Sequence, residues 1–280
     1  MNILVLGRAK TGTTIIAKTI QNSLENASFM MEPTMVHLFL EYPIGNLVTK
    51  IIYEHWSDRP YLRLAIMNNE LSLKFQKKVA IIRDPRDEMI SRLFYIAYAY
   101  FSEKKVSREQ LHPWLEIIKT KERTPQEISF EQMFEVLYKV IGIRHTLHMN
   151  DSFNYIRFLK QNNKNIFILR YEDFIENRLQ PLTDYLEFSL TERRDVGTEF
   201  DRTRRSSGCN NWKNFFIPAD LDKFKQLHGE EMEEMGYTDW QLTPTTSLNP
   251  EHGSLYLERI LQEAVMRLDA KNAPDANKRS

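Results

Sequence analysis

Short apolar runs alternate along this chain with longer segments that carry one apolar face. Short apolar runs predict a buried strand at residues 2–6, which ends at Gly7, and further strands at 28–31, 61–66, 78–83 and 165–170. Apolar positions about four residues apart predict helices between them, at 12–25, 85–101 and 174–188. Strands that alternate with helices indicate an α/β fold, a three-layer doubly wound parallel sheet.

Residues 102–150 follow a different pattern, because they are charged and aromatic and have no strand signal. Two helices are expected there, at 107–120 and 127–148, as a helical insertion over one end of the sheet. The insertion is interpreted as a lid or acceptor-binding element, and ordinary packing helices are an equal alternative.

The last part of the chain reads as a linker at 241–250, a final helix at 251–269 and a frayed tail. We therefore expect one domain over residues 1–245, followed by a C-terminal helix and tail at 246–280. The amphipathic final helix would pack against its own domain or mediate a homodimer.

Composition narrows the function classes. Lys plus Arg number 38 and Asp plus Glu number 38, so the net charge of zero argues against a bulk nucleic-acid binder. The single cysteine, Cys209, excludes an intramolecular disulfide and favours a reducing compartment. The N-terminal apolar stretch is too short for a secretion signal, and no window reaches 18 apolar residues. A cytoplasmic protein without a membrane span is expected.

The first candidate for chemistry is the stretch "LGRAKTGTT" at residues 6–14, between a predicted strand and a predicted helix. Backbone N–H groups at a helix N-terminus and the helix dipole together attract anions. Gly7 and Gly12 have Walker A spacing, but Thr13 occupies the lysine position of that motif, and the loop lysine is Lys10. The loop therefore predicts a phosphate-type ligand, without the lysine that an ATP site requires.

Two further motifs carry groups that suit phosphates. In "IIRDPRDEMISRLF", Arg83 ends a predicted strand and Ser91 lies about two turns into the next helix. Ligands bind at the carboxyl ends of strands in open α/β sheets. In "RTRRSSGCNNWKNFF", residues 202–216, Arg205 precedes a small polar run that could close over a phosphate.

Together, "RAKTGTT", "IIRDPRDEMISRLF" and "RRSSGCNNWKNFF" resemble the phosphosulfate-binding elements of the sulfotransferases that use 3′-phosphoadenosine 5′-phosphosulfate (PAPS). The segment "ILRYEDFIENRLQPLTDYLEF" also resembles that family, and the likeness spans roughly residues 2–216. It implies a P-loop-like fold and a reaction that releases 3′,5′-diphosphoadenosine (PAP). The sequence departs from the family at Ser207, Asn210 and Asn211, where the family often has Gly, Gly and Asp, and Gly208 lies one place off.

The resemblance implies a set of donor-binding residues. The loop would bind the 5′-phosphosulfate through Arg8, Ala9, Lys10, Thr11, Gly12, Thr13 and Thr14. The 3′-phosphate would meet Arg83, Ser91, Arg205, Ser206, Ser207 and Gly208, and the third motif ends in Trp212 and Lys213. Trp212 suits stacking in the nucleotide site and packing in the core equally well.

Sulfuryl transfer would place charge on the bridging oxygen of the leaving phosphate, where Lys10 could stabilise it. A general base must also take a proton from the acceptor. Glu32 occupies the place of the glutamate base in one branch of the family, with ion pairing to a cation such as Arg8 as its structural alternative. His37 is the second candidate base.

The acceptor pocket is expected in residues 34–60 and 102–150. Its aromatic candidates are Tyr53, Trp56, Tyr95, Tyr98, Tyr100 and Trp114. These side chains suit a small-molecule or glycan-like acceptor that presents a hydroxyl or, less readily, an amine. The Glu32-Pro33 pair resembles carbohydrate-type members and leans slightly toward a carbohydrate or glycolipid-like hydroxyl.

Two other function classes compete with a sulfotransferase. One is a P-loop kinase or NTPase with a shifted lysine, and the other is a non-catalytic interaction protein on an α/β scaffold. No metal is expected, because His145 and His148 lack further ligands at metal spacing. Binding of PAP without metal, against binding of ATP with Mg²⁺, separates the three.

Overall fold

The structure is a computed structural model of the chain. It describes residues 1–34, 37, 45–56, 59–103, 106–162, 165–191, 196–197 and 208–272, with side chains to 266. The described residues form two compact units. Unit 1 contains those up to Glu88, those from Met149 to Gly197, and Gly208 with Cys209. Unit 2 contains those from Met89 to His148 and from Asn210 onward.

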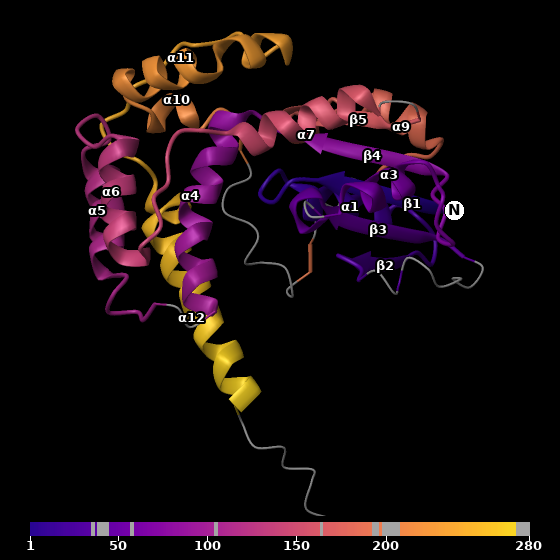
Figure 1. The fold of residues 1–280 in the computed structure, drawn as a ribbon, viewed down its shortest axis with the longest axis horizontal. Coiled ribbons are helices and arrows are strands. Elements are labelled where there is room, and N and C mark those ends of the chain that lie inside the picture. Colours follow the sequence, from indigo (N-terminus) through magenta and orange to yellow (C-terminus); the bar gives the residue numbers. More distant parts are fainter. Residues whose placement is uncertain are drawn as a thin grey trace, which may run out of the picture. The chain divides into compact units, whose positions relative to one another are not determined.

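Unit 1 is built on a parallel sheet (Figure 1). Its five strands are β1 (Asn2–Gly7), β2 (Ser28–Met31), β3 (Leu47–Ile52), β4 (Lys77–Ile82) and β5 (Phe167–Arg170), in the order β2-β3-β1-β4-β5. Every strand pair is parallel. β1 is central, and the strand order changes direction around it, which is the topological switch point of a doubly wound sheet.

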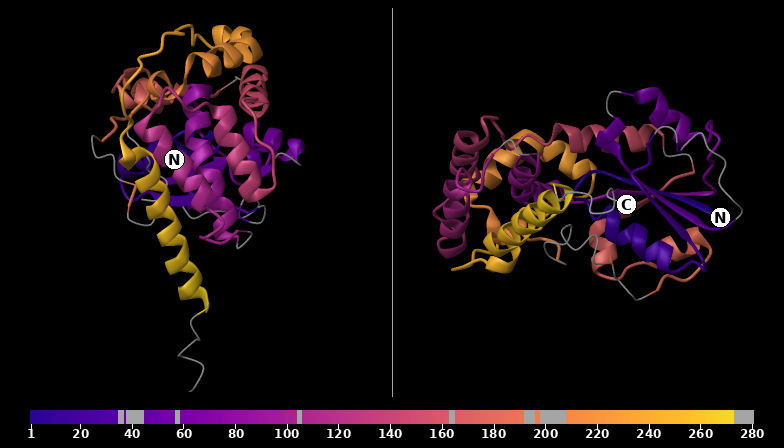
Figure 2. Two further views of the ribbon diagram at one scale, coloured as in Figure 1. Left: turned by 90° about the vertical axis from the view of Figure 1, so that its left-hand side faces the viewer. Right: turned by 90° about the horizontal axis from the view of Figure 1, so that it is seen from below.

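Helices cover both faces of this sheet. The core on one face joins strand side chains to α1 (Thr13–Asn22), α8 (Tyr171–Ile175) and α9 (Gln180–Leu186). Figure 2 shows α3 (Pro60–Met67) and α7 (Asn150–Gln161) on the opposite side from α1 and α9. The hydroxyl of Tyr155 in α7 donates to the Leu6 carbonyl at 3.1 Å, tying that helix to β1. The predicted three-layer α/β fold is confirmed.

Two sequence predictions in unit 1 are wrong. Residues 61–66 were expected as a strand, but they lie in α3. Pro60 takes the first helical position, and Leu62, Ile66 and Met67 form one buried face.

The strand of that region is β3, which is buried throughout but was not predicted because Thr49 and Lys50 interrupt its apolar run. Helix α7 was also not predicted, and the expected helix at 174–188 is two helices, α8 and α9.

Unit 2 is helical in its described residues. It contains α5 (His112–Arg123), α6 (Phe130–Ile141), α10 (Trp212–Phe215), α11 (Pro218–Glu234), the short 3-10 turn η3 (Pro250–His252) and α12 (Ser254–Asn272). Helix α4 (Pro85–Ser102) begins in unit 1 and continues into unit 2. A capping box of Ser129 and Gln132 starts α6.

The predicted insertion helices exist as α5 and α6, and the predicted final helix as α12. The helix expected at 127–148 ends earlier, at Ile141, because Gly142 adopts φ 73° as a left-handed cap. Helix α11 was not predicted. The proposed domain division at residue 245 stays a prediction. Among the described helices, none combines the length and apolar character needed to cross a membrane.

Candidate functional site

Candidate side chains follow the carboxyl end of every strand of unit 1. Glu32 follows β2, Glu54 and His55 follow β3, the Gly7–Gly12 loop follows β1, Arg83 follows β4, and Tyr171 with Glu172 follows β5. The strands are in register, since Gly7 of β1 pairs with Ile52 of β3 and Ile81 of β4. One edge of the sheet therefore gathers these residues, at the position where open α/β sheets bind ligands.

The loop after β1 depends on its two glycines. A Cβ on Gly7 would lie 2.3 Å from the Thr13 methyl group. Gly12 has φ 85°, and a Cβ there would lie 2.3 Å from the Tyr171 ring. Gly12 is also the N-cap of α1, which has no side-chain cap and no acidic residue in its first turn. This helix start is therefore electrostatically suited to an anion.

Lys10 has an unusual backbone for a residue with a side chain, with φ 70°. Its carbonyl accepts a 3.0 Å hydrogen bond from Nη1 of Arg83. The Arg83 guanidinium also lies over the Tyr171 ring, 4.6 Å from its centroid, and 4.0 Å from the Asp87 carboxylate. Arg83 thus contacts the loop directly, so two residues predicted to bind different parts of the donor are adjacent.

The threonines of the loop are buried. The Thr11 hydroxyl donates to the Arg8 carbonyl at 2.9 Å, which closes a turn inside the loop. Thr13 and Thr14 form the first turn of α1, where backbone N–H groups have no partner within the helix. These groups provide the donor set that the sequence predicts for a phosphate-type ligand.

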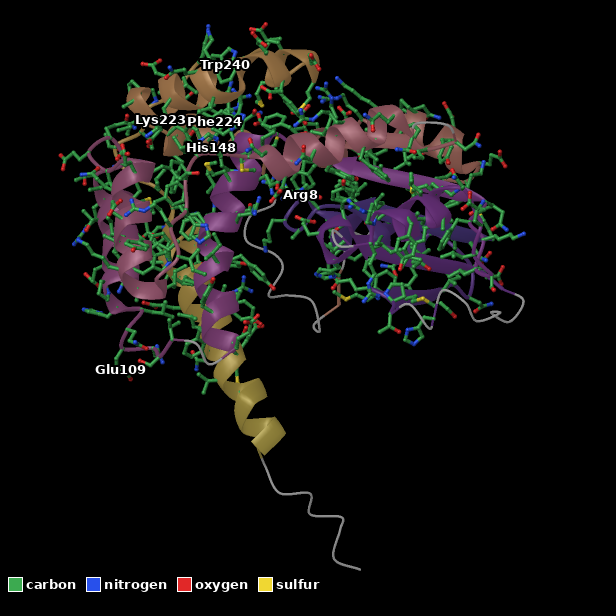
Figure 3. All side chains as sticks on the ribbon, in the orientation of Figure 1. Arg8, Glu109, His148, Lys223, Phe224 and Trp240 are labelled. Atoms are coloured by element: carbon green, nitrogen blue, oxygen red, sulfur yellow. The ribbon has the colours of Figure 1, made fainter. Side chains whose placement is uncertain are left out.

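Arg8 is the most enclosed charge of the loop, at 1% exposure (Figure 3). Its Nη1 lies 2.7 Å from Glu88 and contacts the Ser152 hydroxyl, and its Nη2 lies 3.0 Å from Glu54. The structural alternative for Glu32, an ion pair with a nearby cation, is met by Lys50 and not by Arg8. Arg8 pairs with Glu54 and Glu88, which come from other elements.

Glu32 pairs with Lys50 instead, at 2.6 Å between Oε1 and Nζ. Its other oxygen lies 3.5 Å from Nδ1 of His55. Glu32 also has φ 50° and donates its backbone N–H to the Lys50 carbonyl. The carboxylate is thus held between a buried lysine and a half-exposed histidine.

His37 is exposed, and its described contacts are local. The Thr34 hydroxyl lies 2.8 Å from its Nδ1, and the Thr34 backbone N–H donates to the same nitrogen at 3.2 Å. Its role as a base stays a prediction.

Sequence reasoning missed His55 and Glu54. Both lie in the 3-10 turn η1 (Tyr53–Trp56) that directly follows β3. The missed strand hid them, because residues 34–60 were assigned to an acceptor pocket. An available signal was the polar pair Glu54-His55, one residue after the apolar Ile51-Ile52. Recognising 47–52 as a strand would have placed both side chains at the carboxyl edge.

The β5 end of the site contains a buried carboxyl group. Glu172 accepts the Asp84 backbone N–H at 3.0 Å, and burial raises the pKa of its carboxyl above the usual value. Burial also raises the pKa of the Cys209 thiol, with the Asp87 and Glu172 charges adding to the effect. The thiol is therefore disfavoured as a thiolate nucleophile.

Most of the remaining predicted donor residues lie in unit 2 or outside the described residues. Arg205, Ser206 and Ser207 lie outside the described residues. Ser91 belongs to unit 2, where it is buried in α4. Trp212 is fully buried in unit 2 against Phe216, and Lys213 pairs with Asp239. Trp212 is therefore packed in a core. The contacts of these residues with a donor stay predictions.

A metal site was not expected. Within the described ranges, no group of three or more His, Cys, Asp or Glu side chains is arranged to hold a metal ion. His145 and His148 do not share a helix face, because α6 ends at Ile141. His148 lies against His228, with 6.0 Å between ring centroids.

The parallel sheet and its strand–loop–helix define an α/β protein with a loop of the phosphate-binding type. The sulfotransferase domain model matches residues 1–194, more than half of the chain, so the protein belongs to the sulfotransferase family. No curated protein sequence matches the chain.

The solved structures that are similar to the chain include two with PAP bound. Mouse sulfotransferase SULT7A1 complexed with PAP is 14% identical, with a TM-score of 0.51 over 85% of this chain and 86% of that one. A retinol dehydratase complexed with androsterone and the inactive cofactor PAP is 14% identical, with a TM-score of 0.36 over 100% and 82% of the two chains. At this identity the mouse structure supports the fold alone.

Proposed function

We propose that this sulfotransferase moves the sulfuryl group of PAPS to a hydroxyl of a small-molecule or carbohydrate-like acceptor and releases PAP. The observation that carries the proposal is the contact between Arg83 and the Lys10 carbonyl at 3.0 Å. It joins a loop suited to the phosphosulfate to a guanidinium suited to a second phosphate. PAP in the mouse neighbour supports the choice of donor.

The reaction forms one sulfur–oxygen bond to the acceptor and breaks the bond between sulfur and the bridging oxygen of the donor. The bridging oxygen leaves with PAP and gains negative charge. Lys10 and the N–H groups at the start of α1 stabilise that charge as it develops. Arg83 binds the 3′-phosphate, which holds the donor in line with the acceptor.

The acceptor hydroxyl gives its proton to a base. We assign this role to His55, which follows β3 beside the loop strand, with Glu32 orienting its ring from 3.5 Å. Glu32 itself and His37 remain the bases predicted from the sequence. Substitution of each residue in turn separates the three.

Several aromatic residues expected in the acceptor pocket have packing roles. Tyr53 lies 4.9 Å from Tyr155 and 5.3 Å from Phe158 between ring centroids. Trp114 is fully buried and Tyr98 nearly so. The acceptor class therefore rests on the resemblance more than on these side chains.

A ligand panel tests the donor. PAP without metal should raise the melting temperature by about 5 °C when it is present at about 100 Kd, since saturation at that level adds ~2.7 kcal/mol to stability. ATP with Mg²⁺ at the same concentration should change it by less than about 1 °C, because no lysine follows Gly12. Thermal unfolding measures both.

The reverse ranking would favour a P-loop kinase or NTPase and contradict the proposal. No response to either ligand would favour a non-catalytic interaction protein. Transfer of labelled sulfate from PAPS to a panel of phenols, alcohols and sugars then identifies the acceptor.

A further inference from the structure

A chain of charged contacts ties the donor loop to the turn that carries His55. Glu54 accepts the Ala9 backbone N–H, with 3.3 and 3.2 Å to its two oxygens. The same carboxylate lies 3.0 Å from Nη2 of Arg8. Glu54 therefore holds a backbone group and a side chain of the loop at once.

The Ala9 N–H lies one residue before the left-handed backbone of Lys10. Such a conformation costs free energy and persists only where surrounding contacts fix it. On one side Glu54 fixes Ala9, and on the other Arg83 fixes the Lys10 carbonyl. The two contacts together define the direction in which the Lys10 side chain leaves the loop.

Glu54 is also covalently next to His55, in the same turn η1. A shift of Glu54 would therefore move the loop lysine and the histidine relative to each other. We propose that Glu54 is a positioning residue, which sets the distance between the cation that stabilises the leaving group and the base that takes the acceptor proton. This inference rests on the proposed function of Lys10 and His55.

Glu88 provides a comparison, because it also pairs with Arg8 and accepts the hydroxyl of Ser152, which lies in α7 outside the loop. Glu54→Ala should lower kcat about tenfold to a hundredfold, with a change in PAP affinity below about threefold. Glu54→Gln, which keeps an acceptor for the Ala9 N–H, should recover part of the loss. Glu88→Gln should mainly lower the melting temperature, because it leaves the buried Arg8 charge less well paired.

Amide hydrogen exchange gives a readout that does not depend on turnover. Exchange at Ala9 and Lys10 should be about tenfold faster in Glu54→Ala than in the wild-type protein, and near normal in Glu54→Gln. If exchange is faster in Glu54→Ala but the wild-type protein transfers no sulfuryl group, the proposed function is wrong, while the role of Glu54 in fixing the loop stands. Unchanged exchange in Glu54→Ala, or equal losses of kcat in Glu54→Ala and Glu88→Gln, would show that Glu54 does not position the loop.

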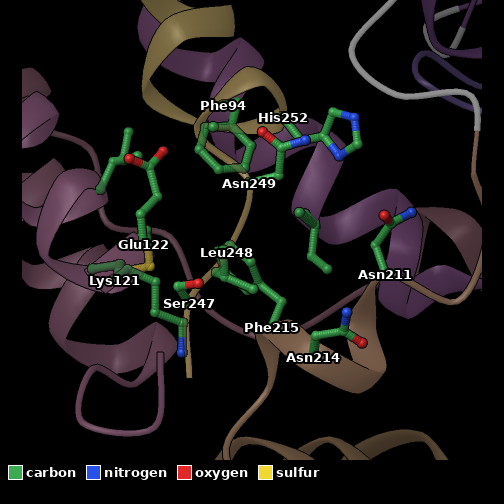
Figure 4. Close-up of a pocket in the computed structure, with 14 residues that line it drawn as sticks. Phe94, Lys121, Glu122, Asn211, Asn214, Phe215, Ser247, Leu248, Asn249 and His252 are labelled. Atoms are coloured by element: carbon green, nitrogen blue, oxygen red, sulfur yellow. The ribbon is translucent and has the colours of Figure 1, made fainter. Parts of the chain in front are cut away.

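A separate observation in unit 2 is a cavity of about 280 Å³ (Figure 4). Its apolar lining comes from Phe94, Ile118, Met133 and Phe215. Its polar lining comes from Asn211, Asn214, Ser247, Asn249 and His252, most of them in α10, η3 and the segments next to them. A cavity with this mixed lining can hold a small molecule that has both an apolar part and a polar group.

The two charges in the cavity wall already have partners. Lys121 donates to the Pro125 and Ile128 carbonyls at 2.6 and 2.5 Å, and burial lowers its pKa to about 8. Glu122 accepts the hydroxyl and the backbone N–H of Ser254 at 2.7 and 2.5 Å. A charged ligand would gain no free counter-ion here and would lose its hydration.

The geometry points to a binding site for a small neutral molecule with a ring or short chain and one amide or hydroxyl group. The volume corresponds to about nine heavy atoms, on the scale of ~30 Å³ for each water-sized unit. Benzamide has this size and is a suitable probe. Benzoate has nearly the same shape with a negative charge, and benzylamine is a slightly smaller ring compound with a positive charge.

Ligand-observed NMR with the full chain should give a Kd for benzamide on the order of 1 mM. Benzoate and benzylamine should bind about tenfold more weakly. Leu248→Trp should fill the cavity and weaken benzamide binding at least tenfold, while Leu64→Trp, at an exposed position in unit 1, should not. Equal binding of all three probes, or unchanged binding by Leu248→Trp, would refute the site.

Discussion

Replacing Lys10 by alanine should lower kcat by about 10²–10³, because one preorganised donor at a developing negative charge contributes that much to the rate. Lys10 lies in the turn between Gly7 and Gly12, and its backbone is held by Arg83 through its carbonyl. The loop should therefore keep its shape in the variant. Steady-state transfer from PAPS, together with calorimetric titration of PAP, measures the two quantities.

The affinity for PAP should change less than the rate, because N–H groups of α1 and the Arg83 guanidinium still bind the phosphates. Lys18→Ala is the matched control. Lys18 lies on α1, and its ammonium contacts Gln21 at 3.0 Å and the Phe29 ring at 4.6 Å. Equal losses of kcat in Lys10→Ala and Lys18→Ala would remove Lys10 from the mechanism.

Replacing His55 by glutamine should lower kcat about a hundredfold, since a general base contributes about 10²–10⁴. Glu32→Gln should lower it about tenfold, because Glu32 lies 3.5 Å from His55 but pairs with Lys50 as well. His37→Gln should stay within about twofold of the wild type, because the described contacts of His37 are to Thr34. Donor affinity should be similar in all three variants.

The ranking of these variants decides the base. If Glu32→Gln shows the largest loss, Glu32 is the base, as the sequence resemblance suggested. If His37→Gln does, the assignment moves to His37. A loss that appears in KM for PAPS instead of kcat would place the residue in donor binding.

Much of the fold was predictable because its signals are local. The apolar runs that became β1, β2, β4 and β5 end at Gly, Glu-Pro or charged residues, and burial explains the continuous runs of β1 and β4. β3 was missed because Thr49 and Lys50 are buried among its apolar residues. The apolar pattern of a sequence does not predict a buried lysine in a strand, because the lysine depends on a partner that the fold brings close. Here the partner is Glu32, which forms an ion pair with Lys50.

The candidate site also has a part that the sequence predicts and a part that only the fold reveals. The loop was predicted from its place between a strand and a helix, and the resemblance assigned Lys10 and Arg83 to the donor; in the structure Arg83 contacts the Lys10 carbonyl. The environment of Arg8 was not predictable, because Glu54, Glu88 and Ser152 are 46, 80 and 144 residues away along the chain. A motif marks neighbouring residues along the chain, whereas the partners of Arg8 come together only through the fold.

The packing of Thr13 against Gly7 bears on how this family relates to kinases. A Walker loop would need lysine at position 13, where the threonine is buried and its methyl group lies close to Gly7. A lysine at position 13 would lose this contact between the methyl group and Gly7. Replacing Thr13 by lysine alone would therefore change the packing of the loop as well as its charge.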